Sequence, residues 1–500
     1  MMRSLFSGVT GLKVHQTKMD VIGNNIANVN TVGFKSSSVN FSDILYQTTS
    51  AATGPNANTG QAGKNAKQIG LGANVAEITT NIDITGGAQR TDNPLDVMIN
   101  GDNFFIVNSG GTNYFTKSGA FKVDANGTLC TSSGATVMGW QVNDDGTDII
   151  KAQVSALKVM SAENLYANPE PTTRATVTGN IDEMDPELSS NGAKVQVSFY
   201  DNVGNTYSLQ LAIKHKTADT KDGLYTVTPV DVTDAEGNSV FVKKDATTGK
   251  YSASSYKIAF GGQSYTVSNS NVNADTGDFT LSGTGIDLTF DSGTGSFTGI
   301  GSTGNKDVRL SLSNNAALGT AAPPANEKQF SEEGNIVNNS VQPFNDVRID
   351  FSTITKYATS GKCNLEGQKG NYNNLGAGKK VGNMTGIAVD DAGKIYGSYD
   401  NGTTKLLGQI AVASFANAAG LESVGNSMFK TTQNSGDFDG VGKDPSEDGK
   451  GLTTGVLEMS NVDLSAEFTQ MITTQRGFQA NSRIITTSDT LLEELINLKR

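Results

Sequence analysis

The sequence predicts a mainly β, multidomain protein whose two chain ends form one α-helical coiled-coil module, with nested, discontinuous β domains between them. Apolar residues recur every seven positions at both ends of the chain, which is the spacing of a coiled-coil seam. The long middle of the chain is rich in Gly, Thr, Asn and Ser and shows short apolar alternations between turn residues, which indicates strands. Because neither terminal stripe has a partner in its own segment, we expect the two ends to pair.

The first helix is expected over residues 4–29, with Ser4 as N-cap and the Asn-rich run before Gly33 as its end. The last helix is expected to begin at Asn461 or Asp463. Two helices cannot cover all of both stripes, so we expect subunits of a polymer to bury the remainder. The predicted subunit-interface residues are Leu5, Val9, Leu12, Met19, Ile22 and Ile26, followed near the other end by Leu464, Phe468, Met471, Phe478, Ile485 and Leu492. A second C-terminal row consists of Ile484, Leu491 and Leu498.

Between the helices, the chain is expected to pass outwards through each domain and to return through the domains in reverse order. Prolines 169, 171 and 186 mark the beginning of the outermost domain, and Pro323-Pro324 marks its end. The expected domains are the terminal helices (1–33 and 455–500), a polar connector (34–75 and 433–454), an inner β domain (76–168 and 336–432) and an outer β domain (169–335).

The composition argues against several classes of partner. The 500 residues include 38 basic and 50 acidic side chains, for a net charge of −12, and show no basic cluster. Neither nucleic acid nor an anionic membrane is therefore expected as a partner. No apolar run reaches the roughly 18 residues of a membrane-spanning helix. Arg3, Lys13 and Asp20 interrupt the apolar core that a cleaved signal peptide would need, so neither membrane insertion nor such a peptide is expected.

No catalytic, cofactor-binding or metal site is expected. Residues 299–304 match G-x-G-x-x-G, but a strand pattern comes directly after them, where a dinucleotide site needs a helix. Residues 376–379 (GAGK) lack the first Gly and the Ser or Thr of a phosphate-binding loop. His15 and His215, the only histidines, show no association with a nucleophile.

Two further groups of residues leave alternatives open. Cys130 and Cys363 favour two unpaired thiols, and a single disulfide is the alternative. An acidic group near the C-terminal helix lacks the D-x-D-x-D-G spacing of a calcium loop, which favours a solvated linker over a calcium site. Its members are Asp437, Asp439, Asp444, Glu447 and Asp448.

Several separate motifs, in the same order, resemble the bacterial flagellar axial proteins, the family of rod, hook and hook-associated subunits. They are residues 24–35 (NNIANVNTVGFK), 93–105 (NPLDVMINGDNFF), 118–121 (SGAF) with Gly139-Trp140, 407–415 (LGQIAVASF), 455–464 (GVLEMSNVDL) and 475–481 (QRGFQAN). The resemblance covers roughly the first 165 and the last 170 residues. Residues 199–201 (FYD) with Gly204-Asn205 resemble the start of the outer domain of hook subunits.

The resemblance implies a structural protein, without enzymatic activity, that polymerises into the flagellar hook. The hook is a curved, flexible tube that acts as a universal joint and transmits motor torque to the filament. The resemblance also implies an extracellular location, reached through the flagellar type III export apparatus. It further implies contacts with the distal rod, the hook cap and the hook–filament junction proteins.

Three alternative functions are open at this point. A distal rod subunit belongs to the same family, but such chains are shorter and lack a domain like residues 169–335. A secreted, β-rich carbohydrate-binding or adhesive protein would be expected to expose aromatic side chains, yet Trp140 is the only Trp and lies in an axial-family motif. A glycan hydrolase would need a pair of carboxylates in a cleft, and nothing in the sequence selects such a pair.

Overall fold

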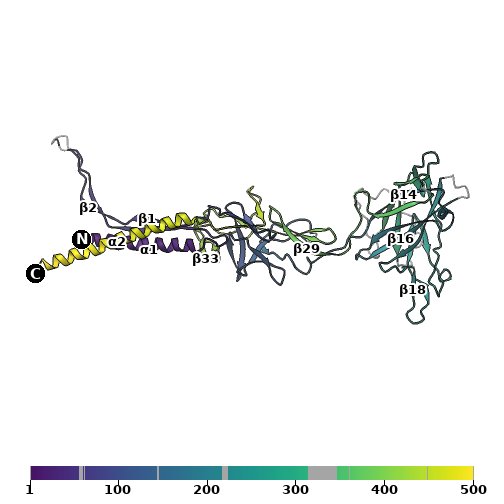
Figure 1. Cartoon of the computed structure of the whole chain (residues 1–500), viewed down its shortest axis with the longest axis horizontal. Coiled ribbons are helices and arrows are strands. Elements are labelled where there is room, and N and C mark those ends of the chain that lie inside the picture. The colour runs from purple at the N-terminus through teal and green to yellow at the C-terminus, as the bar shows by residue number, and fades with distance from the viewer. Residues whose placement is uncertain are drawn as a thin grey trace. The chain divides into compact units, whose positions relative to one another are not determined.

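The computed structural model describes residues 2–55, 60, 62–143, 146–216, 223–313, 346–359, 361–447 and 449–498 (Figure 1). Within these ranges the protein is mainly β, with a long helix near each end of the chain, which confirms the predicted fold class. The chain divides into two compact units. Unit 1 comprises Met1–Leu165, Met384–Ser398 and Thr404–Arg500, and unit 2 comprises Tyr166–Asn383 and Tyr399–Thr403. No helix in the described ranges is long and apolar enough to cross a membrane.

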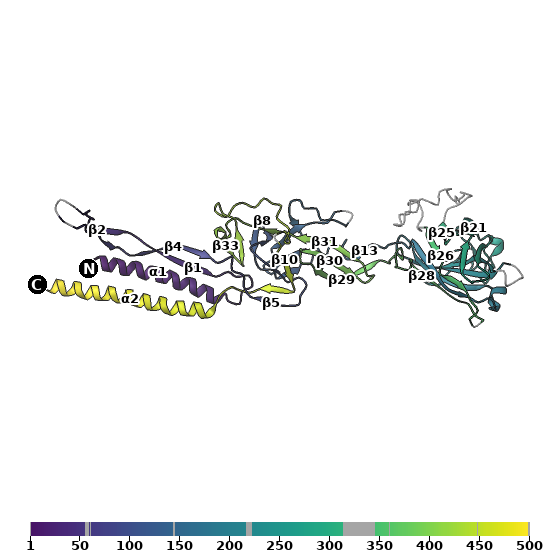
Figure 2. The ribbon, with the colours of Figure 1, turned by 90° about the horizontal axis from the view of Figure 1, so that it is seen from above.

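The two helices of unit 1 are α1 (Met2–Ala27) and α2 (Leu464–Asn497). Helix α2 begins as predicted, because the Asp463 carboxylate caps it and accepts hydrogen bonds from the N–H groups of Ser465 and Ala466. Helix α1 begins two residues before Ser4, so the expected N-cap lies inside the helix. The helices run antiparallel and lie side by side, with both chain ends at the same end of the pair (Figure 2).

A long antiparallel ladder follows α1 in the segment expected to be a connector. Its inner part pairs Ser37 with Thr80 and packs along α1, and its outer part pairs Tyr46 with Gly70. A bulge between Asn40 and Phe41 shifts the register of the inner part. The strands are β1 (Ser37–Asp43), β2 (Tyr46–Ser50), β3 (Lys67–Gly70) and β4 (Ala73–Thr80).

The rest of unit 1 is a β structure with a core built from both halves of the chain. Phe105 and Val107 pack with Ile410 and Val412 in this core, and Trp140 lies in a neighbouring apolar cluster. The outgoing strands are β5 (Ala88–Arg90), β6 (Val97–Ile99), β7 (Phe104–Ser109), β8 (Thr112–Thr116), β9 (Phe121–Val123), β10 (Leu129–Thr131), β11 (Thr136–Trp140) and β12 (Ser155–Ala156). The returning strands are β30 (Lys394–Tyr399), β31 (Thr404–Ile410), β32 (Val412–Ala413), β33 (Glu422–Gly425), β34 (Met428–Lys430), β35 (Leu452–Thr454) and β36 (Val456–Glu458).

Unit 2 contains two larger sheets whose inner faces share one apolar core. One sheet has the order β15-β16-β17-β22-β23-β24, and the other has the order β21-β20-β25-β26-β14-β27, with β28 beside β14. Alternate residues of β15, such as Val195 and Val197, enter the same core as Val177 and Ile349 of the other sheet, as in a β-sandwich. The strands are β13 (Tyr166–Ala167), β14 (Arg174–Ile181), β15 (Ala193–Tyr200), β16 (Thr206–His215), β17 (Leu224–Thr233), β18 (Val242–Lys244), β19 (Tyr251–Ala253), β20 (Lys257–Phe260), β21 (Gln263–Thr266), β22 (Ile286–Phe290), β23 (Phe297–Ile300), β24 (Ser302–Thr303), β25 (Asp307–Ser313), β26 (Val347–Asp350), β27 (Ile354–Lys356) and β28 (Asn364–Lys369).

The chain leaves unit 2 later than the sequence analysis placed the end of the outer domain. From the sequence, residues 336–432 are expected in the inner domain, whereas β26, β27 and β28 all pair with β14 inside unit 2. The boundary between the two units lies in strand β29 (Gly382–Val389), between Asn383 and Met384. The reason is strand pairing: β14 lies at the start of the unit and needs the later strands as neighbours. Residue 336 itself lies outside the described residues.

The G-x-G-x-x-G segment forms a β-hairpin that leads into another strand, as the strand pattern after it predicted. Gly299 pairs with Thr303, so β23 and β24 form a tight hairpin across the motif, and β25 comes next. A dinucleotide-binding motif would instead continue into a helix whose N-terminus faces the phosphates.

Candidate assembly interface

Glycines and polar residues lie where α1 and α2 approach most closely, with Ile485 beside Gly8. A Cβ atom on Gly8 would lie 3.1 Å from Cγ1 of Ile485, and one on Gly11 would lie 2.5 Å from Nδ2 of Asn481. From the opposite side, a Cβ on Gly477 would lie 2.7 Å from Nε2 of His15. The three glycines therefore let the helices approach closely, and larger residues there would push them apart.

The polar residues of this seam also follow a seven-residue spacing. On α2, Glu467, Thr474 and Ser488 are its buried residues, and Asn481 completes the row. The hydroxyl oxygens of Ser4 and Ser488 lie 3.4 Å apart across the seam. Two rows on α2 therefore follow the heptad spacing that predicted a coiled coil. One row is polar and faces α1, and the other is apolar and lies beside it.

The predicted interface residues are distributed around this polar seam. Ile22 is buried within unit 1, whereas Val9, Leu464 and Phe468 are exposed. The remaining predicted residues are partly exposed: Leu5, Leu12, Met19, Ile26, Met471, Phe478, Ile485 and Leu492. The structure of the single chain therefore leaves apolar side chains of both stripes accessible to a partner.

The ladder beside α1 exposes further apolar side chains that the sequence analysis did not include in its interface. The sequence signal was present, because these residues are large and apolar within an otherwise small and polar segment. Their accessibility depends on the ladder having α1 on only one side, and sequence alone does not show this. The exposed residues are Phe41, Ile44, Leu45, Tyr46, Ile69 and Ile78.

Asn25 connects α1, α2 and the ladder. Its Nδ2 donates hydrogen bonds to Oε1 of Glu467 (3.0 Å) and to the carbonyl oxygen of Ser37 (2.8 Å). Its Oδ1 accepts a hydrogen bond from the N–H of Ser37 (3.0 Å). Because Asn25 is almost fully buried, these bonds stabilise one relative position of the three elements.

A buried ion pair lies where the helical part of unit 1 meets its β structure. Nζ of Lys35 lies 2.8 Å from Oε1 of Glu458, and the two side chains are 2% and 1% exposed. Lys35 also donates to the carbonyl oxygen of Ile84 (2.7 Å), and Oε1 of Glu458 accepts from the N–H of Gly86 (3.0 Å). The pair joins the outgoing chain to the returning chain, so it forms only when both segments are in place.

The Glu458→Gln variant is expected to destabilise unit 1 by about 3–5 kcal/mol, because it leaves Lys35 charged and buried without its counter-charge. The free energy of unfolding in urea measures this effect. Asp92→Asn is the matched control: its partner Arg90 and Asp92 itself are 82% and 72% exposed, so the change should be below about 1 kcal/mol. Equal effects of the two variants would contradict the structural role of the buried pair.

A second buried lysine lies close to this ion pair. Burial, together with the positive charge of Lys35, lowers the pKa of Lys117 to about 8. Nζ of Lys117 donates a hydrogen bond to the carbonyl oxygen of Gly101 (2.6 Å) and lies over the ring of Phe104. The adjoining backbone requires Gly33, whose φ of 67° is left-handed and whose Cβ would lie 2.7 Å from the nitrogen of Ser118. The junction is therefore closely packed around both charged side chains.

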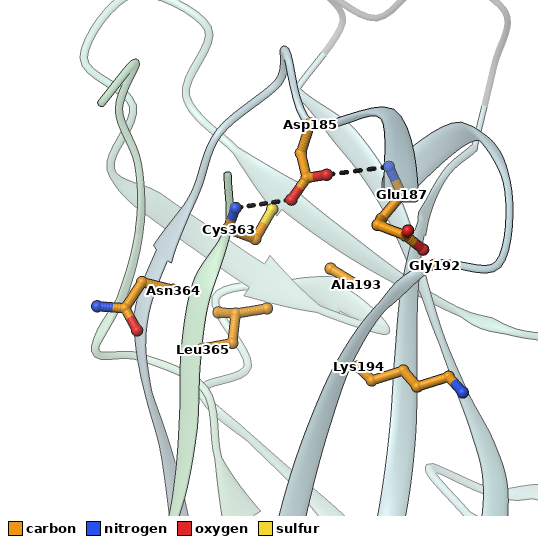
Figure 3. A pocket seen from close by; sticks show the side chains of 8 residues that line it. All are labelled: Asp185, Glu187, Gly192, Ala193, Lys194, Cys363, Asn364 and Leu365. Carbon is orange, nitrogen blue, oxygen red and sulfur yellow. Dashed lines mark hydrogen bonds between the residues drawn. The ribbon is translucent and has the colours of Figure 1, made fainter. Parts of the chain in front are cut away.

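The hydrogen bonds beside a pocket in unit 2 stabilise the backbone rather than activate a reactive group. In Figure 3, Asp185 lies between Cys363 and Glu187 and accepts hydrogen bonds from their backbone N–H groups (2.7 and 2.9 Å). Burial raises the pKa of the Cys363 thiol to about 12, so the thiol stays protonated and weakly nucleophilic near neutral pH. The pocket is lined by Asp185, Glu187, Gly192, Ala193, Lys194, Cys363, Asn364 and Leu365.

The cysteines and the acidic group show no metal-like arrangement among the described residues. Cys130 and Cys363 are both free. Asp439 accepts hydrogen bonds from the backbone N–H groups of Val441 and Gly442. Asp444 pairs with Lys151 (3.0 Å), and within the described ranges no group of three or more His, Cys, Asp or Glu could hold a metal ion. Asp448 lies outside those ranges.

Models of known protein families match the two helices and part of the β structure of unit 1. The flagella basal body rod protein model matches residues 5–35, which include most of α1. The flagellar hook protein FlgE/F/G D1 domain matches residues 98–163, and the flagellar basal body rod FlgEFG C-terminal model matches residues 453–498, which include α2.

Relatives of this chain match over its full length. The flagellar hook protein FlgE of Treponema pallidum is 32% identical, and that of Borreliella burgdorferi is 33% identical, each with 100% of both chains covered. The Escherichia coli flagellar hook protein FlgE is 29% identical, with 98% of each chain covered. Given these full-length matches, the chain belongs to the flagellar hook protein family and is a structural subunit of the part of the flagellum outside the cell.

Proposed function

We propose that this chain polymerises into the curved hook tube through the terminal helices and the adjoining ladder of unit 1. The observation that carries the proposal is the separation of polar and apolar residues on the helix pair. The two helices approach most closely at Gly8, Gly11 and Gly477, largely through polar side chains, while apolar residues such as Phe468 remain exposed. Exposed apolar surface of this kind is typical of protein–protein interfaces.

A helical polymer follows if the contact between copies is head-to-tail and does not close into a ring. In such a tube, the helix pair would supply the contacts along the axis, and their apolar side chains would lose most of their exposure. Unit 2 would supply contacts that change as the tube bends, since a universal joint must rotate while curved. Many of the exposed residues of the unit 2 loops are small and polar, which suits contacts that break and reform readily.

We also infer the remaining partners and the route of export from the family. The proposed partners are the distal rod, the hook cap and the hook–filament junction proteins, with export through the flagellar type III apparatus and without a cleaved signal peptide. The contact of Asn25 with Glu467 supports the retention of α1 in the mature subunit, because removing α1 would leave α2 without its seam. No enzymatic role is proposed.

Electron microscopy of the purified, concentrated full-length protein tests the proposed polymerisation. We expect curved tubes to form above a critical concentration. Straight, rigid tubes would favour the distal rod subunit instead, and a protein that stays monomeric at every concentration would contradict the proposal.

A further inference from the structure

Helix α2 extends beyond α1 at the end of the helix pair where both chain ends lie (Figure 2). Ser4 lies opposite Ser488, and α1 begins at Met2, only two residues before Ser4. Because α2 continues to Asn497, its last turns have no α1 residue opposite them. We name residues 491–498 the α2 overhang.

The seam residues of α2 change from polar to apolar beyond the N-terminus of α1. The polar row of Glu467, Thr474, Asn481 and Ser488 continues seven residues later with Leu495. Leu491, Leu495 and Leu498 have the i, i+4, i+7 spacing of a coiled-coil seam and are 51%, 49% and 83% exposed. A row that turns from polar to leucine at the point where it loses its own partner indicates a second, intermolecular partner.

A matching surface lies on α1. Met2, Phe6 and Val9 also follow the i, i+4, i+7 spacing and are 75%, 58% and 53% exposed. At 100° per residue they lie on the opposite side of α1 from the seam residues Ser4 and Gly11, so α2 of the same chain leaves them accessible. This surface, formed by Met2, Phe6 and Val9 with Arg3 at its edge, we name the α1 face.

The charges of the two surfaces are complementary. At 100° per residue Glu494 flanks the leucine row of the overhang, whereas Asp489 and Glu493 lie on the other side of α2, and no basic residue lies among residues 484–498. The α1 face carries Arg3 and lies at the positive end of a helix that has no acidic residue in its first turn. Lys499 and Arg500 follow the overhang and lie outside the described residues. Two overhangs meeting each other through their leucines would instead bring their Glu494 side chains together.

We propose that the α2 overhang of one copy docks on the α1 face of a second copy, so that the seam of one helix pair continues into its neighbour. The proposal rests on the proposed function, because it names the contact that would connect successive subunits of the polymer. It assigns the exposed leucines of the C-terminal end to a specific partner surface, in place of a general apolar contact.

The Leu495→Asn variant tests the energetic part of the proposal. We expect it to raise the critical concentration for tube formation by about tenfold or more, because it places an amide in a contact that should be apolar. Thr490→Asn is the matched control: Thr490 is exposed on the same end of α2 but on the side away from the seam, so it should change the value by less than about twofold. Circular dichroism of the dilute monomers should show the same helix content for both variants and the unchanged chain.

Disulfide crosslinking between copies identifies the partner surface. In a Cys130→Ser, Cys363→Ser background, copies carrying Phe6→Cys are mixed with copies carrying Leu495→Cys, assembled and oxidised. We expect crosslinks between the two kinds of copy in tubes, and far fewer between two Leu495→Cys copies. Preferential crosslinking of Leu495→Cys copies to each other, or to copies carrying Tyr46→Cys on the ladder, would overturn the assignment.

The outcomes also separate this inference from the proposed function. If the unchanged chain forms tubes and Leu495→Asn assembles at the same concentration, the overhang contact is wrong while polymerisation stands. If the unchanged chain forms no tubes at any concentration, the proposed function fails, and the docking proposal fails with it.

Discussion

The Phe478→Asp variant is expected to form no tubes, although its β structure should fold normally. Phe478 is only partly buried in the single chain and follows Gly477, which contacts His15 in the helix seam. Assembly should bury this side chain further, so an aspartate there would lose water without gaining a counter-charge. The cost should be about 3 kcal/mol or more for each subunit added, which corresponds to a rise of more than about a hundredfold in the critical concentration.

Sedimentation and electron microscopy of the assembled material measure this effect. Gln479→Asp is the matched control, because Gln479 is the next residue and is exposed, so the same charge would remain in water. Urea unfolding should show an unchanged transition for the β structure in both variants. Tubes of the Phe478→Asp protein at the normal concentration would contradict the role proposed for this face of α2.

Removal of residues 168–381 is expected to leave a chain that still folds as unit 1 and still forms tubes. In β13, Tyr166 pairs with Asn383 and Ala167 pairs with Gly382, so the ends of the deletion lie on adjacent antiparallel strands. A two-residue Asn-Gly turn can join such strands directly. The axial helices are retained, but contacts made by unit 2 are absent, so the tubes should lose their preferred curvature.

Electron microscopy gives the curvature of these tubes, and tubes with unchanged curvature would contradict the mechanical role proposed for unit 2. Deletion of residues 169–335 is the informative comparison. It removes β14 but keeps β26, β27 and β28, which pair with β14. The strands left without a partner would expose unpaired edges, so this shorter deletion should aggregate while the longer one stays soluble.

The sequence was sufficient to predict the helices, the β class and the family. Heptad spacing requires only that apolar residues recur along one chain segment, and Asp463 is a strong local helix-start signal, so both are readable without tertiary information. The family motifs are equally local, because each lies within a dozen or so consecutive residues. The G-x-G-x-x-G segment could be distinguished from a nucleotide site for the same reason, because the strand pattern of the next few residues excludes the helix that such a site needs.

Only the tertiary structure decided which surfaces meet. Periodicity defines the faces of a helix but not their partners, and on α2 the polar row through Thr474 and Asn481, rather than the apolar row through Phe478, lies at the centre of the seam. Alternation likewise indicates a strand at Val347–Asp350, but only the fold shows that it pairs with β14. Lys35 and Glu458 are 423 residues apart in the sequence. Their buried pairing forms only because the segment before α2 packs against the segment after α1. Such long-range contacts depend on the whole fold, which is why local patterns could not predict them.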